Sequence, residues 1–160
     1  MDDIELRGLT PDDGGWVVER HGALYAAEAG FDASFEALVG EIIAAFLRSH
    51  DTLRERGWIA WAGGRRVGCI FCVRVSDEVA KLRLFLLEPE MRGQGLGRRL
   101  LQTCMGFARA QGYRRLMLWT HASHREACAL YAASGFTLTA SKPVHNYGLD
   151  LVEQEWQIEL

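Results

Sequence analysis

The glycine-rich turn at residues 92–97, with the sequence Arg-Gly-Gln-Gly-Leu-Gly, constrains what this chain can fold into more than any other feature. The apolar run before it, residues 79–87, predicts a strand, and the apolar residues after it recur with helical spacing until Gly112. The first N–H groups of a helix have no partner within the helix and carry the positive end of its dipole. A glycine-rich turn between a strand and a helix is therefore typical of an anion-binding site.

The composition of the turn suits a phosphate group. Gly93, Gly95 and Gly97 carry no Cβ atom that would hold a diphosphate away from the N–H groups, and glycine adopts the dihedral angles of a tight anion-binding turn. Arg92 can form a bidentate hydrogen bond with phosphate. Arg98 lies in the first turn of the expected helix, at the positive end of the dipole. Its charge destabilises the helix by roughly 0.3–1 kcal/mol unless an anion offsets it.

Two other phosphate-binding motifs do not fit this spacing. The chain lacks Gly-x-x-x-x-Gly-Lys-Ser/Thr, and Arg98 occupies the place of the third glycine in a dinucleotide-binding motif. The remaining alternative is a turn with no ligand, which the flanking arginines and the preceding apolar strand disfavour.

At these residues the chain resembles the Gcn5-related N-acetyltransferase (GNAT) superfamily, whose signature is Arg/Gln-x-x-Gly-x-Gly/Ala. Leu87-Glu88-Pro89 also resembles the end of the family's fourth strand, which leads into this loop. The resemblance implies that the loop binds the diphosphate of coenzyme A. It also implies an α/β fold with a mixed, mostly antiparallel sheet of about seven strands and about four helices, in which strands four and five are parallel and splayed.

The hydrophobic pattern of the first third of the chain agrees with that element order. Residues 4–6 predict a short strand, and residues 16–30 predict a first helix. A second helix is expected over residues 35–47 behind a Ser34 cap, with its apolar residues, Leu38 among them, on one buried face.

The rest of the chain supplies a sheet. Strand-like segments occur at residues 58–61, 67–75, 79–87, 115–120, 137–140 and 156–160. The first three predict an antiparallel meander, and a right-handed crossover would place the fourth parallel to the third. No linker or repeat interrupts the chain, so we expect a single domain over residues 1–160.

The last predicted helix carries a second resemblance. Ser123 and Glu126 have the spacing of a capping box at its start. The series His124, Ala127, Leu130, Tyr131, Gly135 and Phe136 resembles the family pattern Asn-x-x-Ala-x-x-Leu-Tyr-x-x-x-Gly-Phe, with His124 in place of the asparagine. The resemblance implies that Tyr131 protonates the leaving thiolate. Apart from the family pattern, a tyrosine on such a helix is a core residue with a satisfied hydroxyl.

Attack of an amine on a thioester creates an oxyanion and expels a thiolate, so the site needs hydrogen-bond donors and a proton for sulfur. We expect unpaired backbone groups where the central strand splays from its parallel neighbour beyond Leu86 and Leu87. No covalent enzyme intermediate is implied. The resemblance implies contacts with acetyl-CoA from Phe85, Leu86, Leu87, Arg92, Gly93, Gln94, Gly95, Leu96, Gly97, Arg98, His124, Ala127 and Tyr131.

A general base is harder to identify. Glu78 is the first candidate because it opens the central strand, although a carboxylate in a turn is often only solvated. His145 in the expected loop at residues 142–147 is an alternative, and the family often lines its acceptor pocket from this loop and from the first two helices. A water relay would leave no mark in the sequence.

Composition and charge restrict the partners. The chain has 160 residues, of which 49% are hydrophobic and 24% charged, and a net charge of −3. An acidic chain disfavours a nucleic-acid surface, for which the candidates would be Arg92, Arg98, Arg99, Arg114 and Arg115. Residues 1–3 do not resemble a leader, and the longest apolar run, residues 42–47, is too short to cross a bilayer, so a cytoplasmic protein without membrane contact is expected.

No metal site is expected. Cys69 and Cys72 form a C-x-x-C sequence, but residues three apart on a strand point to opposite faces. They are interpreted with Cys104 and Cys128 as unpaired cysteines of the core. His121-x-x-His124 has no further ligand at a matching spacing.

The sequence thus predicts an acetyl-CoA-dependent N-acetyltransferase that acts on a small-molecule or peptide amine by direct attack, with homodimers possible as in the family. The alternative is an acyl-CoA sensor without turnover. More narrowly, residues 15–22 and 80–84 resemble the acetyltransferase half of fused MarR-type regulators. The winged-helix half has no counterpart in this sequence, so DNA binding is not implied.

Overall fold

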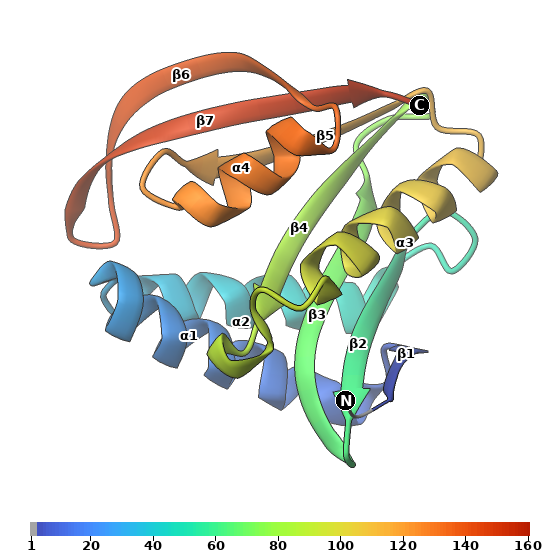
Figure 1. Ribbon diagram of the computed structural model, residues 1–160, viewed down its shortest axis with the longest axis horizontal. Helices are drawn as coiled ribbons and strands as arrows, with labels where there is room; N and C mark the ends of the chain where they lie inside the picture. Colours follow the sequence, from blue (N-terminus) through green and yellow to red (C-terminus); the bar gives the residue numbers. More distant parts are fainter. Residues whose placement is uncertain (1–2) are drawn as a thin grey trace.

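A computed structural model describes residues 3–160, so Met1 and Asp2, where no leader was expected, lie outside it. Its centre is a seven-stranded sheet with the order β1-β2-β3-β4-β5-β7-β6 (Figure 1). The strands are β1 (Ile4–Gly8), β2 (Arg56–Ala62), β3 (Arg65–Arg74), β4 (Val79–Leu87), β5 (Arg115–His121), β6 (Thr137–Asn146) and β7 (Leu149–Glu159). The helices are α1 (Gly14–Ala29), α2 (Ala33–Ser49), α3 (Leu96–Ala110) and α4 (Arg125–Ala133), with 3-10 turns η1 (Pro11–Asp13) and η2 (Pro89–Met91).

Each face of the sheet has its own hydrophobic core. On one face, α3 packs over β2 to β5 with Leu100, Leu101 and Cys104 fully buried. On the other face, α1 and α2 pack on β2, β3 and β4, around Val17 and Val39. Figure 1 shows α3 and α4 on the near side of the sheet and α1 and α2 behind it.

The expected pairing of the strands is confirmed, with one correction. β2, β3 and β4 form the antiparallel meander, and β4 is parallel to β5. The β4–β5 ladder spans only three residue pairs and ends at Lys81 opposite Met117. The two strands therefore separate from Leu82 onward, several residues before the predicted point beyond Leu86 and Leu87.

Two predicted helix starts are wrong. The cap of α2 is Asp32, whose carboxylate accepts a 3.0 Å hydrogen bond from the backbone N–H of Ser34, so the predicted cap residue lies inside the helix. The first residue of α4 follows His124, and the predicted capping box from Ser123 does not form. Leu38, expected on the buried face of α2, is 39% exposed.

The last two strands are much longer than predicted. β6 and β7 form a long hairpin whose turn is Tyr147 and Gly148, so the expected loop at residues 142–147 is mostly strand and contains His145. β6 is an edge strand with mainly exposed side chains, so it lacks the apolar alternation that reveals a half-buried strand. Its turn contacts the α1–α2 connection, where the N–H of Asp32 donates to the carbonyl of Tyr147 at 3.0 Å.

An ion pair between the partly exposed Arg20 and the buried Glu88 joins α1 to the residue that follows β4. Arg20 donates two hydrogen bonds to Glu88, Nε to Oε1 at 2.6 Å and Nη2 to Oε2 at 2.9 Å. Glu88 is 7% exposed, so this carboxylate depends on its partner. The pair sets the position of α1 beside the glycine-rich turn.

The interpretation of the cysteines as core residues holds for three of them. Cys69, Cys72 and Cys104 are buried, and Cys69 and Cys72 belong to the cores on opposite faces of the sheet, while Cys128 is partly exposed. No helix within residues 3–160 combines the length and the apolar character that crossing a membrane would need.

The core under α3 should be sensitive to loss of volume. Leu100 is 0% exposed, so Leu100→Ala should lower the free energy of unfolding by about 2–5 kcal/mol and the melting temperature by roughly 5–15 °C. Leu53→Ala is the matched control, because Leu53 is 73% exposed and should change stability by less than about 0.5 kcal/mol. Thermal denaturation followed by circular dichroism measures both, and equal shifts would contradict the assignment of this core.

Candidate functional site

A cavity of about 670 Å³ opens where β4 and β5 separate. Its walls come from α1, α2, the second half of β4, the glycine-rich turn, the end of β5 and α4. The lining residues used below are His21, Tyr25, Glu28, Phe35, Arg83, Arg92, Arg98, Trp119, His124 and Tyr131.

Most residues with a predicted cofactor contact line this cavity. They are Phe85, Leu86, Leu87, Arg92, Gly93, Gly95, Gly97, Arg98, His124, Ala127 and Tyr131. Gln94 and Leu96 do not. The side-chain amide of Gln94 donates to the carbonyl of Glu90 at 2.9 Å, and Leu96 is 2% exposed in the core.

The three glycines of the turn have different tasks. Gly93 and Gly95 have φ angles of +74° and +86°, which disfavour any residue with a Cβ atom, and apart from their chain neighbours no atom lies within 4 Å of their Cβ position. A Cβ atom at Gly97 would lie 3.0 Å from Leu87 and 3.5 Å from Leu130. Gly97 therefore lets the start of α3 approach β4 and α4, while Gly93 and Gly95 shape the loop.

The N-terminus of α3 is free to bind an anion. Gly95 caps it without a side chain, and its first turn contains no acidic residue. Arg98 lines the cavity, and no carboxylate within residues 3–160 forms an ion pair with it. Arg99 is engaged elsewhere, because its Nη1 donates to the carbonyl of Ile4 at 2.7 Å.

Arg92 already holds a carboxylate. Its two Nη atoms each donate to one oxygen of Glu28 on α1, both at 2.7 Å. This hydrogen bond to Arg92 lowers the pKa of Glu28, so the carboxylate stays charged. The guanidinium of Arg92, which the sequence predicts to bind phosphate, thus already binds a carboxylate of α1.

The backbone of β4 is irregular beside the cavity. Leu84 has a φ of +52°, and the register with β3 shifts between Cys69 and Phe71, which is the signature of a β-bulge. The carbonyl of Leu84 accepts from the Cys69 thiol at 3.2 Å. Beyond Lys81 the groups of β4 that face β5 have no ladder partner, so they are available to a ligand.

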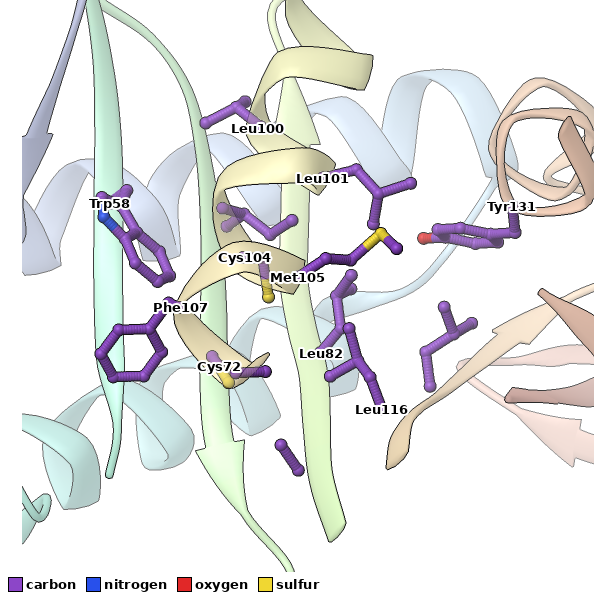
Figure 2. Close-up of a cluster of buried hydrophobic side chains, with 14 of the residues drawn as sticks. Trp58, Cys72, Leu82, Leu100, Leu101, Cys104, Met105, Phe107, Leu116 and Tyr131 are labelled. Atoms are coloured by element: carbon purple, nitrogen blue, oxygen red, sulfur yellow. The ribbon is translucent and has the colours of Figure 1, made fainter. Parts of the chain in front are cut away.

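Tyr131 lies at the junction of this cavity and the core under α3. It is 4% exposed, and Figure 2 shows its hydroxyl directed toward the side of Leu101 and Met105. Within residues 3–160 the hydroxyl has no hydrogen-bond partner. Burial raises the pKa of Tyr131 well above its usual range, so the phenol keeps its proton at physiological pH.

His21 on α1 is buried, and its tautomer is fixed. It is 1% exposed, and its Nδ1 lies 2.7 Å from the carbonyl oxygen of Val17. A carbonyl can only accept, so Nδ1 carries the proton and Nε2 presents a lone pair. Nε2 is buried and has no partner among the described residues, and burial lowers the pKa of His21 to about 4.

His124 is a second neutral imidazole on the cavity wall. Its Nε2 also lacks a partner in the described part of the chain, and burial, with a smaller contribution from His121, lowers the pKa of His124 to about 4. Its ring packs against Tyr25 and Phe31 at centroid distances of 5.2 and 5.7 Å. No group of three or more potential metal ligands is found within residues 3–160.

The two candidate bases lie outside this cavity. Glu78 is an exposed residue before β4 whose carboxylate lies 3.9 Å from Arg114, at the end where β4 and β5 are still paired. His145 on β6 contacts Asp150 at 2.8 Å, and both side chains are exposed. Neither lines the cavity, so the structure does not bring them to Tyr131.

Sequence reasoning missed many residues of the cavity wall, among them His21, Glu28, Arg83 and Trp119. His21 and Glu28 follow the helical pattern of α1, and nothing local distinguishes them from core and surface positions. Arg83 interrupts an apolar strand, and that interruption was the one available signal.

The sequence matches a family profile over most of its length. Residues 19–136 match the acetyltransferase (GNAT) family. N-acetyltransferase 8F1 from Rattus norvegicus is 31% identical over 109 residues, which are 65% of this chain and 48% of that protein. N-acetyltransferase 8 from Homo sapiens is 37% identical over 95 residues, 54% of this chain and 42% of that protein. The chain thus spans about half the length of the curated relatives it matches.

Solved structures share the fold. An acetyltransferase from Streptococcus agalactiae 2603 superimposes with a TM-score of 0.78 at 23% identity, covering 98% of both chains. A GNAT family acetyltransferase from Elizabethkingia anophelis, solved with acetyl-CoA bound, has a TM-score of 0.71 at 19% identity and covers 100% of both chains.

Burial of His21 should make stability depend on pH. Its folded-state pKa of about 4 lies below the unfolded value of 6.5, so its stabilising contribution is complete above pH 6.5 and is lost as the pH falls toward 4. Between pH 7 and 4.5 the wild type should therefore lose about 2–3 kcal/mol more than His21→Gln. Urea denaturation at both pH values measures this, with His145→Gln at an exposed position as control. Equal losses in wild type and His21→Gln would refute a buried neutral His21.

Proposed function

The chain belongs to the acetyltransferase (GNAT) family, and from this premise we propose that it is an N-acetyltransferase that transfers the acetyl group of acetyl-CoA to a primary amine. One observation carries the proposal. The gap between β4 and β5, the turn with the free N-terminus of α3, and Tyr131 all border the same cavity.

The residues present fit the proposed donor. The N–H groups at the start of α3 and Arg98 would hold its diphosphate, because neither has an anionic partner within residues 3–160. The open edge of β4 would hydrogen-bond the amide-containing arm and the acetyl carbonyl. When bound, acetyl-CoA supplies an acetyl group activated as a thioester. A volume of about 670 Å³ is within the usual range for such sites.

Tyr131 is proposed as the general acid. Its raised pKa keeps it protonated, so it can donate to sulfur in the cavity. Proton transfer from so weak an acid requires that the thiolate is also poorly solvated, which burial of the sulfur beside Tyr131 provides.

His21 is proposed as a hydrogen-bond acceptor and not as the final proton acceptor. Its Nε2 lone pair is fixed by the bond from Nδ1 to Val17, so it can orient an N–H group in the cavity. A pKa of about 4 makes it too weak to keep an ammonium proton. We propose that this proton leaves through water, and Glu78, which lies outside the cavity, has no part in it.

Turnover tests the proposed function. Release of free thiol from acetyl-CoA is measured against a panel of primary amines, with hydrolysis in the absence of amine as the blank. Thiol release that depends on an amine supports a transferase. Binding of acetyl-CoA without thiol release from any amine would instead indicate a sensor.

The role of Tyr131 can be tested by removing one oxygen atom. Tyr131→Phe keeps the ring that packs against Phe136 and Trp156, but it removes the proton donor. We expect kcat to fall by about 10²- to 10⁴-fold while the Kd for acetyl-CoA changes little. Steady-state kinetics and calorimetry measure the two quantities. Undiminished turnover at all pH values would exclude Tyr131 as the acid.

The ion pair between Glu28 and Arg92 should compete with the diphosphate. Glu28→Gln removes a charged carboxylate and releases the fork of Arg92, so acetyl-CoA should bind about tenfold more tightly. Isothermal titration calorimetry measures the Kd, with Glu41→Gln on the exposed face of α2 as the control. Weaker binding in Glu28→Gln would mean that Glu28 holds Arg92 ready for the ligand.

A further inference from the structure

Arg83 is a half-buried cation of the cavity wall that lacks a counter-ion. It lies in the middle of β4 and lines the cavity, and within residues 3–160 no carboxylate forms an ion pair or hydrogen bond with it. Burial lowers the pKa of Arg83, and no carboxylate opposes this effect. A charge withdrawn from water without a partner is unfavourable, so such a group in a cavity points to an anionic ligand.

The anion is not the diphosphate of the proposed donor. Ala80 and Leu82 belong to the core under α3, so the alternation of β4 places Lys81 and Arg83 on the opposite face of the sheet. The bulge keeps Leu84 on that face too, because Leu84 packs in the core under α1 and α2. The turn and Arg98 belong to α3 and its start, on the other face.

An aromatic ring across the gap from Arg83 suits the apolar side chain of an amino acid. Trp119 on β5 lines the cavity and is 56% exposed, and its ring lies 4.0 Å from Nζ of Lys81. Its register neighbour on β7 is Glu155, which accepts from the indole N–H at 3.2 Å. Glu153 lies two residues along the same face of β7. Burial and the charge of Arg83 lower the pKa of Lys81, and the charge of Glu153 only partly offsets them. Arg83 and Trp119 thus line the same cavity, whereas Glu153 and Glu155 lie outside its wall and Glu153 pairs with Lys142 at 3.7 Å.

We propose that the acceptor is an amino acid or a related amine that carries a carboxylate, which Arg83 binds by a bidentate hydrogen bond. This inference rests on the proposed function. The carboxylate would lie on β4, and an apolar side chain would pack on Trp119. In the reaction the ammonium group first loses one proton to water. The C–N bond then forms as the C–S bond breaks, the leaving sulfur takes a proton from Tyr131, and the second amine proton restores Tyr131 through water.

Matched acceptors test this inference on the wild-type protein. L-Leucine and L-phenylalanine are each compared with their primary amide and with the corresponding decarboxylated amine. The comparison uses equal concentrations of neutral amine, because removing the carboxylate changes the pKa of the amine. We expect kcat/KM to be about ten- to a hundredfold higher for the carboxylates. Equal or higher values for the amides and amines would overturn the inference and leave the proposed function intact.

Substitution of Arg83 tests whether this residue binds the carboxylate of the acceptor. Arg83→Gln should lower kcat/KM for the carboxylates to the level of the amides and leave kcat/KM for the amides and the KM for acetyl-CoA unchanged. Arg83→Lys should recover part of the loss, since it keeps the charge but not the fork. Arg109→Gln, on the exposed face of α3 outside the cavity, is the control. A rise in the KM for acetyl-CoA alone would assign Arg83 to the donor and overturn the inference.

Binding measurements distinguish a failure of the proposed carboxylate site from a failure of the proposed transfer reaction. If no amine releases thiol, the proposed transfer reaction fails, and calorimetry with L-leucine and L-leucinamide on the protein saturated with acetyl-CoA decides about the site. Binding of L-leucine that Arg83→Gln abolishes would still support a carboxylate site. Binding of neither compound, or equal binding of both, would refute it.

Discussion

The structure of this site depends on the early end of the β4–β5 ladder. Two parallel strands normally continue side by side, but here the pairing stops at Lys81 and Met117, and a bulge at Leu84 bends the second half of β4 away. Backbone groups in the middle of a sheet would be costly if they were buried without partners. The separation is therefore stable only because the space between the strands is a cavity that a ligand or water can enter. Arg83, Arg98, His21, His124 and Tyr131 all border that space.

Helix α1 forms the second wall of the cavity, and two ion pairs hold it in this position. The pair of Arg20 with Glu88 joins α1 to the end of β4, and the pair of Glu28 with Arg92 joins it to the glycine-rich turn. Between these two attachments, two helical turns apart, lies His21 with its lone pair. The pair of Glu28 with Arg92 also occupies a guanidinium that could bind phosphate. The position of α1 and the affinity for the proposed donor are therefore coupled.

The sequence predicted those parts of the site that depend on local backbone geometry. The glycines of the turn, the apolar β4 and the pattern around Tyr131 each show in a short window, and the family resemblance that they carry implied about seven strands with a parallel pair. Contacts between distant segments could not be predicted in this way. Glu28 and Arg92 are 64 residues apart, and nothing near either one indicates the other. The N-cap of α2 was predicted wrongly for a local reason. Ser34 and Asp32 are both residue types that favour this position, and only the backbone angles select Asp32.

The division between the two faces of the sheet explains why the proposed donor could be inferred from sequence and the acceptor could not. On the face of α3, recognition relies on backbone N–H groups, so it demands glycines at fixed spacing, and those glycines form a motif. On the opposite face the proposed recognition relies on side chains such as Arg83 and Trp119, which belong to strands and need no glycine. A strand tolerates many residues at such positions, so chains of this fold can change acceptors without changing the motif. In this proposal the acceptor is selected by charges on this face that lack a counter-ion, and no carboxylate within residues 3–160 forms an ion pair with Arg83.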